Sequence, residues 1–506
     1  NLYKEINTFY VDDIDPAKLM RTGIDAMLES LDPYTNYISE SEIEGFRFMT
    51  EGRSNGIGAS IKKYGDDITI TRAYADSPAL KAGLKPGDII LAVDGKTAIG
   101  KSRADVNNIL KGYPGTEVLL SIKRPGEAKA LKVKLVREEV KVSNVPFSGM
   151  INDKVGYIAL TTFTRNAGKN VADALKKLKD ENAGIKGVIF DLRGNGGGLL
   201  TEAVNVSNVF IPKGELVVTT KGKVADWDRS FKTLNNPIDQ ELPLVILMNN
   251  GTASASEIVS GVIQDLDRGV LMGQRSYGKG LVQNTKDVGY NSKVKMTMAK
   301  YYIPSGRCIQ AVSYSNGEPI HIPDSERTPF KTRNKRLVYD GGGLRPDLEI
   351  KDATSSQIIR SLRDQHMIFH FATDYCMKNT NIASPQDFKF SNFNEFTDFL
   401  KKKNFDYQTD SEKVLVELEK LAKDENYLND IKSNIKSVQT KIAQIKKTDL
   451  EMHKKEIIDL IEKEIISRTY YQKGRIQIGL RNDMEITKAV ELLGNTAEYK
   501  KLLGGQ

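Results

Sequence analysis

A buried apolar run that leads into a helical pattern is the clearest feature of the chain. Leu244–Met248 is apolar throughout, which predicts a strand covered on both faces. The polar and glycine residues 249–251 interrupt this run. Residues 254–263 then follow helical spacing and have a candidate N-cap at their start. We therefore predict a strand, a turn and a helix in that order.

Similar elements occur on both sides of this segment. Residues 187–193 predict a buried strand that runs into the glycine-rich loop 194–198. Residues 155–160 predict another strand, and residues 170–179 a helix with its apolar side chains at helical spacing. Residues 293–299 alternate polar and apolar side chains, as a half-buried strand does. Strands and helices thus alternate along the middle of the chain.

The N-terminal third contains the signals of a small β-domain. Residues 55–61 place two glycines at the start of a strand, and residues 68–70 predict a second strand. Asp94 followed by Gly95 is typical of a hairpin turn. A plain bend in an unrelated small β-domain is the alternative interpretation of the paired glycines.

The last part of the chain differs in composition. From Ser355 onward the sequence is rich in Lys, Glu, Asp, Ile and Leu and poor in glycine. A helical pattern begins at residues 357–362, and residues 427–447 and 452–467 predict amphipathic helices. Such a helical region could bind a partner, mediate oligomerisation or shape access to a cleft.

Length and charge narrow the function classes. The 506 residues suffice for three or four domains, and 74 basic against 66 acidic residues give a net charge of +8. No dense basic cluster with interleaved aromatic residues suggests nucleic-acid binding. Cys308 and Cys376 are too few for a disulfide framework and have no metal-site spacing. No apolar run is long enough to cross a bilayer.

Ser254 and Lys279 are the first candidates for chemistry. A serine at a helix start lies beside free backbone N–H groups and the positive end of the helix dipole, which favours an oxyanion there. Its hydroxyl needs a base, and a lysine can be that base only if its pKa falls, which burial can cause. Lys279 lies between Gly278 and Gly280.

Structural interpretations compete with this one. Serines before helices are usually caps, and an isolated lysine is usually solvated. Ser256 lies as close to the helix start as Ser254, so spacing alone leaves the choice between them open. Residues 273–280 also match a phosphate-binding loop, except that Gly280 stands where Ser or Thr should bind magnesium. An extended segment rather than a helix is predicted after it, which disfavours nucleotide binding.

The glycine loop and the histidines add to the enzyme interpretation. Successive glycines in residues 194–198 allow backbone N–H groups to converge on an anion, although a tight turn is the commoner role.

The chain has four histidines, and only His321 lies before the C-terminal third. A Ser-His-Asp arrangement is therefore poorly supported, and there is no Gly-x-Ser-x-Gly elbow.

Three motifs in order make the resemblance specific. Residues 191–198, 251–258 and 278–283 resemble the carboxyl-terminal processing proteases, also called tail-specific proteases, over roughly residues 20–352. The family consists of serine peptidases with a Ser-Lys dyad. The resemblance implies Ser254 as the nucleophile in preference to Ser256.

The resemblance also assigns the other site residues. It implies Lys279 as the general base and Gln283 as the residue that orients it; on an extended segment these two would share one face. The oxyanion hole would be the backbone N–H of Ala255 with that of Gly198, or alternatively Gly197. No metal or other cofactor is implied.

The N-terminal β-domain resembles a PDZ domain, especially in residues 82–88. PDZ domains bind a C-terminal peptide as an added strand and hold its carboxylate in backbone amides. The amide-bearing loop would be Gly56, Ile57 and Gly58. The resemblance therefore implies that one module selects chain ends and a neighbouring serine hydrolase cuts them.

The implied architecture is a mixed, multidomain α+β protein. We expect an N-terminal helical segment at residues 1–50, a PDZ domain at 51–138, an α/β peptidase core related to the crotonase and ClpP folds at 139–352, and a C-terminal helical domain at 353–506. Expected partners are proteins or peptides with a free, apolar C-terminus, and the helical domain could bind an adaptor or a second copy.

Two other function classes stay open at this point. One is a catalytically inactive peptide-binding scaffold, against which the presence of Ser254, Lys279 and Gln283 argues. The other is a crotonase-like acyl-CoA enzyme, which would need neither a PDZ domain nor a serine nucleophile.

The family resemblance implies a location in the bacterial cell envelope, and within it the periplasm. Because the sequence starts at Asn1, we expect a signal peptide or anchor to have been removed.

Overall fold

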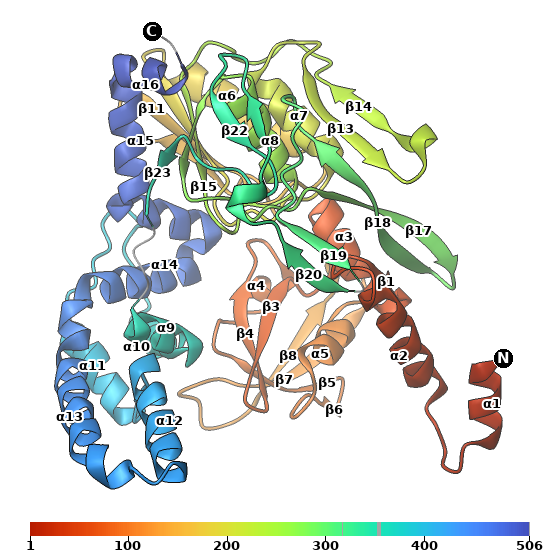
Figure 1. Ribbon diagram of the computed structural model, residues 1–506. Helices are drawn as coiled ribbons and strands as arrows, with labels where there is room; N and C mark the ends of the chain where they lie inside the picture. Colours follow the sequence, from red (N-terminus) through yellow and green to blue (C-terminus); the bar gives the residue numbers. More distant parts are fainter. Residues whose placement is uncertain (316, 352–355, 505–506) are drawn as a thin grey trace.

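The central layer of the molecule is a six-stranded sheet in the order β10-β11-β12-β15-β16-β23 (Figure 1). The computed structural model describes residues 1–315, 317–351 and 356–504. β10 runs antiparallel to β11, and the other neighbours are parallel. The strands are β10 (Phe147–Met150), β11 (Val155–Ala159), β12 (Gly187–Asp191), β15 (Leu244–Met248), β16 (Val270–Gly273) and β23 (Leu348–Glu349).

Helices cover both faces of this sheet. Ile246 faces a core shared with α6 (Ala167–Glu181), α7 (Leu200–Phe210) and α8 (Ala255–Asp265). The neighbouring Val245 and Leu247 face α15 (Met484–Gly494) and α16 (Thr496–Leu502). Successive strand residues point to opposite faces, so a strand buried on both reads as a continuous apolar run. Helices α15 and α16 thus cover one face of a sheet whose second strand, β11, begins some 330 residues earlier in the chain.

A second sheet forms the N-terminal β-domain, in the order β3-β4-β5-β7-β8 with β6 beside β5. β3 is an edge strand that pairs with β4 alone among the described strands. Buried Ile, Leu and Val side chains fill the space between this sheet and its two helices. The elements are β3 (Ala59–Tyr64), β4 (Asp67–Ala73), α4 (Pro78–Lys81), β5 (Ile89–Val93), β6 (Lys96–Thr97), α5 (Arg103–Leu110), β7 (Glu117–Lys123) and β8 (Leu131–Val136).

A third sheet joins the N-terminal segment to the segment that follows Lys279. Its order is β1-β18-β13-β14. β17 also pairs with β18, in an antiparallel arrangement. Its strands are β1 (Asn36–Ile38), β13 (Leu216–Gly222), β14 (Arg229–Lys232), β17 (Leu281–Gly289) and β18 (Ser292–Tyr302). The N-terminal helices are α1 (Leu2–Phe9), α2 (Pro16–Glu29) and α3 (Ile43–Glu51).

Three small antiparallel pairs complete the strands: β2 with β9, β19 with β20, and β21 with β22. Their bounds are β2 (Arg53–Gly56), β9 (Glu138–Lys141), β19 (Val312–Ser315), β20 (Glu318–His321), β21 (Pro329–Lys331) and β22 (Leu337–Tyr339). Short 3-10 helices lie at Glu40–Glu42, Ala225–Trp227, Asp324–Glu326 and Leu480–Asn482.

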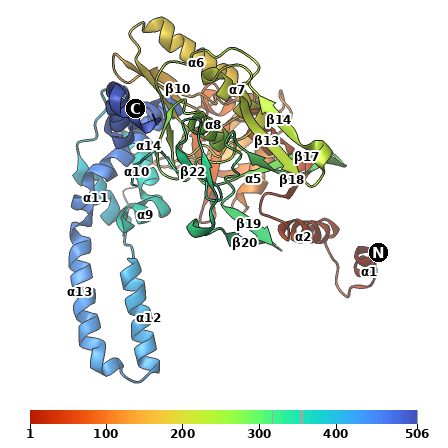
Figure 2. The ribbon, with the colours of Figure 1, turned by 45° about the horizontal axis from the view of Figure 1, so that its top comes forward.

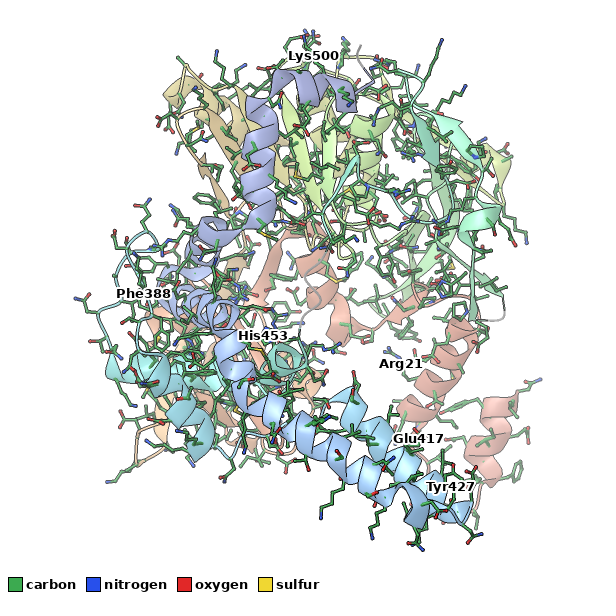
Figure 3. The ribbon with its side chains drawn as sticks, turned by 60° about the vertical axis from the view of Figure 1, so that its left-hand side comes forward. Arg21, Phe388, Glu417, Tyr427, His453 and Lys500 are labelled. Carbon is green, nitrogen blue, oxygen red and sulfur yellow. The ribbon has the colours of Figure 1, made fainter. Side chains whose placement is uncertain are left out.

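The helical region packs its own core of phenylalanine and isoleucine side chains. Its elements are α9 (Gln357–Asp364), α10 (Met367–Lys378), α11 (Phe393–Lys402), α12 (Asp410–Asp424), α13 (Leu428–Met452) and α14 (Lys454–Gly479). α12 and α13 form a hairpin that projects from the body (Figure 2), with Glu417 and Tyr427 near its far end and His453 at its base (Figure 3). None of the helices in the described ranges has both the length and the apolar character needed to cross a membrane.

The structure confirms the predicted fold class, a mixed multidomain protein with a layered α/β core, a PDZ-like sheet and a helical extension. The strand at Leu244–Met248 has the predicted bounds. Helix α14 extends well beyond the predicted residue 467 and contains one non-helical residue, Tyr471. The packing of α15 and α16 on the core sheet was not anticipated. The domain boundaries themselves stay predictions.

Candidate active site

Ser254 caps the N-terminus of α8, directly after strand β15 and its turn. Its backbone has φ 57° and ψ −115°, a combination that costs a non-glycine residue free energy. Strained residues of this kind concentrate at functional sites. The strand, turn and helix predicted here are therefore present, and the turn presents Ser254 half-buried beside a cavity.

Ser256 has a different environment. Its side chain is fully buried, and Oγ donates a 2.8 Å hydrogen bond to the carbonyl of Asn195. The backbone N–H of Ala253 donates to the same carbonyl at 3.0 Å. The hydroxyl of Ser256 therefore ties α8 to the glycine loop, and it does not line the cavity beside Ser254.

The glycine loop lies against the start of α8. Asn195 holds the loop, because its Oδ1 accepts the N–H of Gly197 at 2.9 Å. A Cβ atom on Gly197 would lie 2.8 Å from the Ala255 nitrogen and 2.9 Å from the Ser254 Cβ, so only glycine fits. A Cβ on Gly198 would lie 2.5 Å from the Phe163 carbonyl oxygen.

Two backbone N–H groups beside Ser254 are free to bind an anion. In the described ranges, neither the N–H of Gly198 nor that of Ala255 donates a hydrogen bond to another group of the protein. Ala255 is the first residue of α8, where a helix has unpaired N–H groups and positive potential. Both residues line the cavity that contains Ser254.

Lys279 lies in the extended segment before β17 and is half-buried. Burial, together with the nearby charge of Lys295, lowers its pKa from 10.5 to about 8, whereas Asp32 and Glu257 oppose the shift. The Nζ atom lies 4.3 Å from the ring centroid of Tyr34, a cation–π contact. No helix follows Lys279, which is the outcome expected if the segment is not a phosphate-binding loop.

A buried carboxylate joins the serine segment to the lysine segment. Glu257 accepts hydrogen bonds from the backbone N–H groups of Ser254 (2.8 Å), Gly278 (2.7 Å) and Lys279 (2.9 Å) and from Ser276 Oγ (2.5 Å). Its side chain is fully buried, which raises its pKa despite these four donors. Sequence reasoning gave this residue no role. The signal was its place three residues after a helix N-cap, where a glutamate often completes a capping box.

Gln283 lines the same cavity, where its side chain has a hydrogen-bond partner other than Lys279. Its Nε2 donates a 3.1 Å hydrogen bond to Thr297 Oγ1 on β18. The register of β17 against β18 shifts between Val282 and Gln283, where β18 has one extra residue, and Gln283 is thereby paired with Thr297. Within the described part of the chain, no hydrogen bond joins the side chains of Ser254, Lys279 and Gln283 to one another.

The cavity itself has a volume of about 660 Å³. All the predicted catalytic and oxyanion-hole residues line it: Ser254, Lys279, Gln283, Gly197, Gly198 and Ala255. Apolar side chains from α3, including Phe46 and Met49, form another part of its wall. The structure thus brings together residues from three distant sequence motifs.

The predicted peptide-binding loop lies between β2 and β3. The carbonyls of Ile57 and Gly58 accept hydrogen bonds from Ala79 and Tyr74, at 2.8 and 2.9 Å. The N–H groups of Ile57 and Gly58 donate to no other group within the described residues. Gly58 has φ +71°, and a Cβ there would collide with Ser77. The loop therefore fixes two N–H groups at the start of the edge strand β3.

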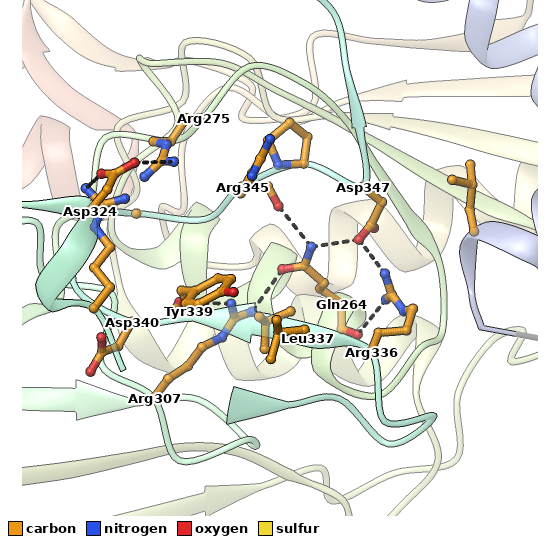
Figure 4. Close-up of a pocket in the computed structure, with 15 residues that line it drawn as sticks. Gln264, Arg275, Arg307, Asp324, Arg336, Leu337, Tyr339, Asp340, Arg345 and Asp347 are labelled. Carbon is orange, nitrogen blue, oxygen red and sulfur yellow. Dashed lines mark hydrogen bonds and ion pairs between the residues drawn. The ribbon is translucent and has the colours of Figure 1, made fainter. Parts of the chain in front are cut away.

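A separate cavity of about 570 Å³ contains neither Ser254 nor Lys279 (Figure 4). Ion pairs form much of its wall: Arg307 pairs with Asp265 at 2.7 Å, and Arg336 pairs with Asp347 at 2.5 Å. The side chain of Gln264 donates to Asp347 at 2.8 Å. These contacts attach the segment that closes the core to the end of α8.

Comparison with protein families gives three matches. Residues 154–315 match Peptidase family S41, residues 69–124 match the PDZ domain, and residues 358–493 match "Probable PDZ-protease, C-terminal helical domain". Together with the layered α/β core, these matches define the class of the protein: a serine peptidase with a PDZ domain and a helical extension.

Curated relatives specify the family. The carboxy-terminal-processing protease of Bartonella bacilliformis is 34% identical over 329 residues, which are 65% of this chain and 75% of the relative. The probable CtpA-like serine protease of Staphylococcus aureus (strain COL) is 36% identical over 327 residues, 64% of each chain. The chain belongs to the carboxy-terminal-processing proteases, as the sequence motifs had indicated.

Two of the similar solved structures are of a C-terminal processing protease or of one of its domains. A photosystem II D1 C-terminal processing protease is 27% identical, with a TM-score of 0.37, over 69% of this chain and 91% of that one. The PDZ domain of a carboxy-terminal protease from Vibrio cholerae, in complex with a peptide, is 30% identical with a TM-score of 0.17, over 18% of this chain and 99% of that one. Family membership rests on the sequence relatives, and it excludes the acyl-CoA enzyme and disfavours the inactive scaffold.

Proposed function

We propose that the protein is an endopeptidase in which Ser254 is the nucleophile and Lys279 the general base. The observation that carries the proposal is the cavity that both residues line, with Glu257 bonded to the backbone of each. The lowered pKa of Lys279 supports it, because a base must be neutral to accept a proton. At pH 7 a pKa of about 8 leaves roughly a tenth of the lysines neutral, a few hundred times more than for an ordinary lysine.

The reaction proceeds in two acyl transfers. Lys279 takes the hydroxyl proton as Ser254 Oγ bonds to the scissile carbonyl carbon, and the tetrahedral intermediate collapses when the carbon–nitrogen bond breaks. The proton passes from Lys279 to the leaving amine. Water then attacks the ester, its proton passes to Lys279, and the Ser254 oxygen regains a proton as the second product leaves.

The oxyanion is assigned to the two free N–H groups beside the serine, those of Ala255 and Gly198. Each donor in such a hole contributes about 3–4 kcal/mol to transition-state stabilisation. Gly197 supports the assignment indirectly, because its missing side chain lets the loop approach the Ala255 nitrogen. The N–H of Gly197 is less suited, since it already donates to Asn195.

Gln283 is assigned the role of orienting Lys279 when a substrate is bound. In the present arrangement each of the two side chains has another partner, Thr297 for Gln283 and the Tyr34 ring for Lys279. Engagement of the dyad therefore requires Lys279 Nζ to leave Tyr34 and turn toward Ser254. Side-chain rotation of this kind is common as a site tightens around its substrate.

The PDZ domain is assigned the capture of the substrate's C-terminal tail. Two features support this role: the exposed edge of β3, which can accept a further strand, and the N–H groups of Ile57 and Gly58, which can hold a carboxylate. The apolar residues of α3 in the catalytic cavity suit an apolar tail segment.

The helical hairpin and the cellular location complete the proposal. Exposed apolar side chains on α12 and α13, such as Val414 (62% exposed) and Ile445 (59%), suit an adaptor or a second copy. Sedimentation of the full chain would test whether a second copy binds at this surface.

We place the protein in the bacterial cell envelope, in the periplasm, which fractionation of the source cells would test.

An active-site label tests the central assignment. A phosphonofluoridate reacts with the activated serine of a serine hydrolase and leaves a stable phosphonyl adduct. Peptide mapping by mass spectrometry should find the adduct on Ser254 and none on Ser256. The Lys279→Ala protein should label far more slowly. An adduct on Ser256, or equal labelling of the Lys279→Ala protein, would contradict the proposed dyad.

A further inference from the structure

A second cavity lies between the PDZ domain and the helical extension, with a volume of about 730 Å³. β3 and β4 form one wall, and α10 and α14 form the other. Figure 1 shows α10 and α14 beside this sheet. Aromatic contacts join the two walls: the ring centroid of Tyr64, at the end of β3, lies 4.4 Å from that of His366 and 5.6 Å from that of Phe369.

The lining of this cavity is strongly basic. Among its described lining residues one is acidic, Glu464, and six are basic: Lys62, Arg72, Lys85, Arg103, Arg468 and Arg475. Glu464 is already paired with Arg468 at 3.4 Å and Arg475 at 3.3 Å. In the described part of the chain, the other four cations have no carboxylate within 4 Å. The described lining of the cavity therefore carries an excess of positive charge.

Arg468 gives the cavity a rigid, desolvated centre. Its side chain is only 5% exposed, and its guanidinium donates to the carbonyls of Pro86 (3.1 Å) and Phe369 (2.8 Å), one from each domain. Its Nε is buried and has no hydrogen-bond partner among the described residues. A buried donor without a partner costs free energy that a bound acceptor recovers.

The basic cavity adjoins the catalytic cavity. Arg72 lines both of them. The consecutive residues Tyr471 and Gln472 line the basic and the catalytic cavity respectively. Tyr471 is the non-helical residue within α14, with φ 54° and ψ −151°. These backbone angles are unfavourable for a tyrosine and break the helix. The two cavities therefore meet at this break in α14.

We propose that the basic cavity binds an acidic segment of the polypeptide substrate, in the part of the chain next to the scissile bond. The inference rests on the proposed peptidase function and adds a substrate preference to it. Arginine pairs strongly with carboxylates, and a desolvated site strengthens such pairs. Because Arg72 lines both cavities, a chain cut at Ser254 can continue into the basic one, which favours the substrate over a free anion.

Peptide binding to the inert Ser254→Ala protein tests the proposal. Two fluorescent peptides share an apolar C-terminus, and one has Asp and Glu where the other has Asn and Gln beside the cleavage site. Anisotropy at low salt should give at least tenfold tighter binding of the acidic peptide, with a difference that shrinks as salt rises. The added Arg72→Gln and Arg103→Gln substitutions should abolish the difference, whereas Lys176→Gln on exposed α6 should preserve it.

Several outcomes would overturn the inference. Equal binding of the two peptides would show that the charge is not used for substrate recognition. Binding of inorganic tripolyphosphate without any preference for the acidic peptide would make the cavity a free-anion site. Arg72→Glu should reduce the preference for the acidic peptide more than Arg72→Gln does, and failure to do so would remove Arg72 from the site.

The test separates the cavity from the catalytic assignment. Cleavage of acidic and neutral peptides by the unmodified protein with equal kcat/KM would contradict the acidic preference and leave Ser254 untouched. Selective binding of acidic peptides by a protein that cleaves neither would support the cavity and contradict the peptidase function.

Discussion

The backbone N–H groups of Ser254 and Lys279 donate to one buried carboxylate, that of Glu257, at 2.8 and 2.9 Å. The two residues come from different segments, one at the start of α8 and one before β17. A shared acceptor fixes the distance between the segments without occupying the side chain of Ser254 or Lys279. Glu257 therefore acts as a positioning residue for the proposed dyad.

Replacement of this carboxylate should damage both fold and activity. In Glu257→Gln an NH₂ group faces backbone donors, and at least one buried hydrogen bond is lost. We expect a loss of about 2–4 kcal/mol in the free energy of unfolding and a fall in kcat/KM. Urea denaturation and peptide cleavage measure the two effects, with Glu241→Gln on the surface as the control. Unchanged stability and activity would show that Glu257 does not connect the segments.

Activity should rise with pH as Lys279 loses its proton. Only the neutral amine can accept the serine proton, so kcat/KM is low below the pKa of about 8 and levels off above it. Lys295 lowers the pKa of Lys279, so Lys295→Gln should move the midpoint to higher pH. Lys300→Gln, an exposed change on the same strand, should not. A profile that is flat from pH 6 to 10 would contradict the role of Lys279.

The glycine loop should tolerate no side chain at Gly197. A methyl group there meets the Ala255 nitrogen at 2.8 Å and requires a φ of +96°, which displaces the proposed oxyanion donors. We expect Gly197→Ala to lower kcat by roughly a hundredfold, with a smaller change in KM. Gly184→Ala is the matched control, since a Cβ atom added there would have no other atom within 4 Å. Wild-type kcat in Gly197→Ala would exclude the loop from the oxyanion hole.

Tail capture should depend on the charge of the substrate's terminus. An amidated C-terminus cannot form charge-assisted hydrogen bonds with the N–H groups of Ile57 and Gly58, so binding to Ser254→Ala protein should weaken about tenfold. In Gly58→Ala the loop is distorted by the contact with Ser77, and the two peptides should bind alike. If amidated and free peptides bound the unaltered loop equally well, the carboxylate clamp would be ruled out.

Local patterns predicted the elements around the site well. Leu244–Met248 and the helix after Ser254 are specified by adjacent residues, so periodicity and turn residues sufficed. The choice between Ser254 and Ser256 required tertiary information, because the Asn195 carbonyl that accepts from Ser256 lies about sixty residues away in the chain. The family motif alone supplied that choice, which stays a prediction.

Long-range contacts account for what the sequence could not predict. Glu257 accepts hydrogen bonds from Ser276, Gly278 and Lys279. The hydroxyl of Tyr499 on α16 hydrogen-bonds both backbone groups of Leu244, at 2.9 and 3.0 Å. No local pattern encodes such pairs. The same applies to the contact of Gln283 with Thr297, which depends on a register shift between β17 and β18.

The most direct test of the central claim compares Ser254→Ala with Ser256→Ala on a substrate that has an apolar C-terminal tail. Ser254→Ala should lower kcat/KM by at least about ten-thousandfold while circular dichroism shows an unchanged fold. Ser256→Ala loses one buried hydrogen bond, about 1 kcal/mol of stability, and should remain active within a few-fold. Full activity in Ser254→Ala, or loss of activity in a folded Ser256→Ala alone, would contradict the account.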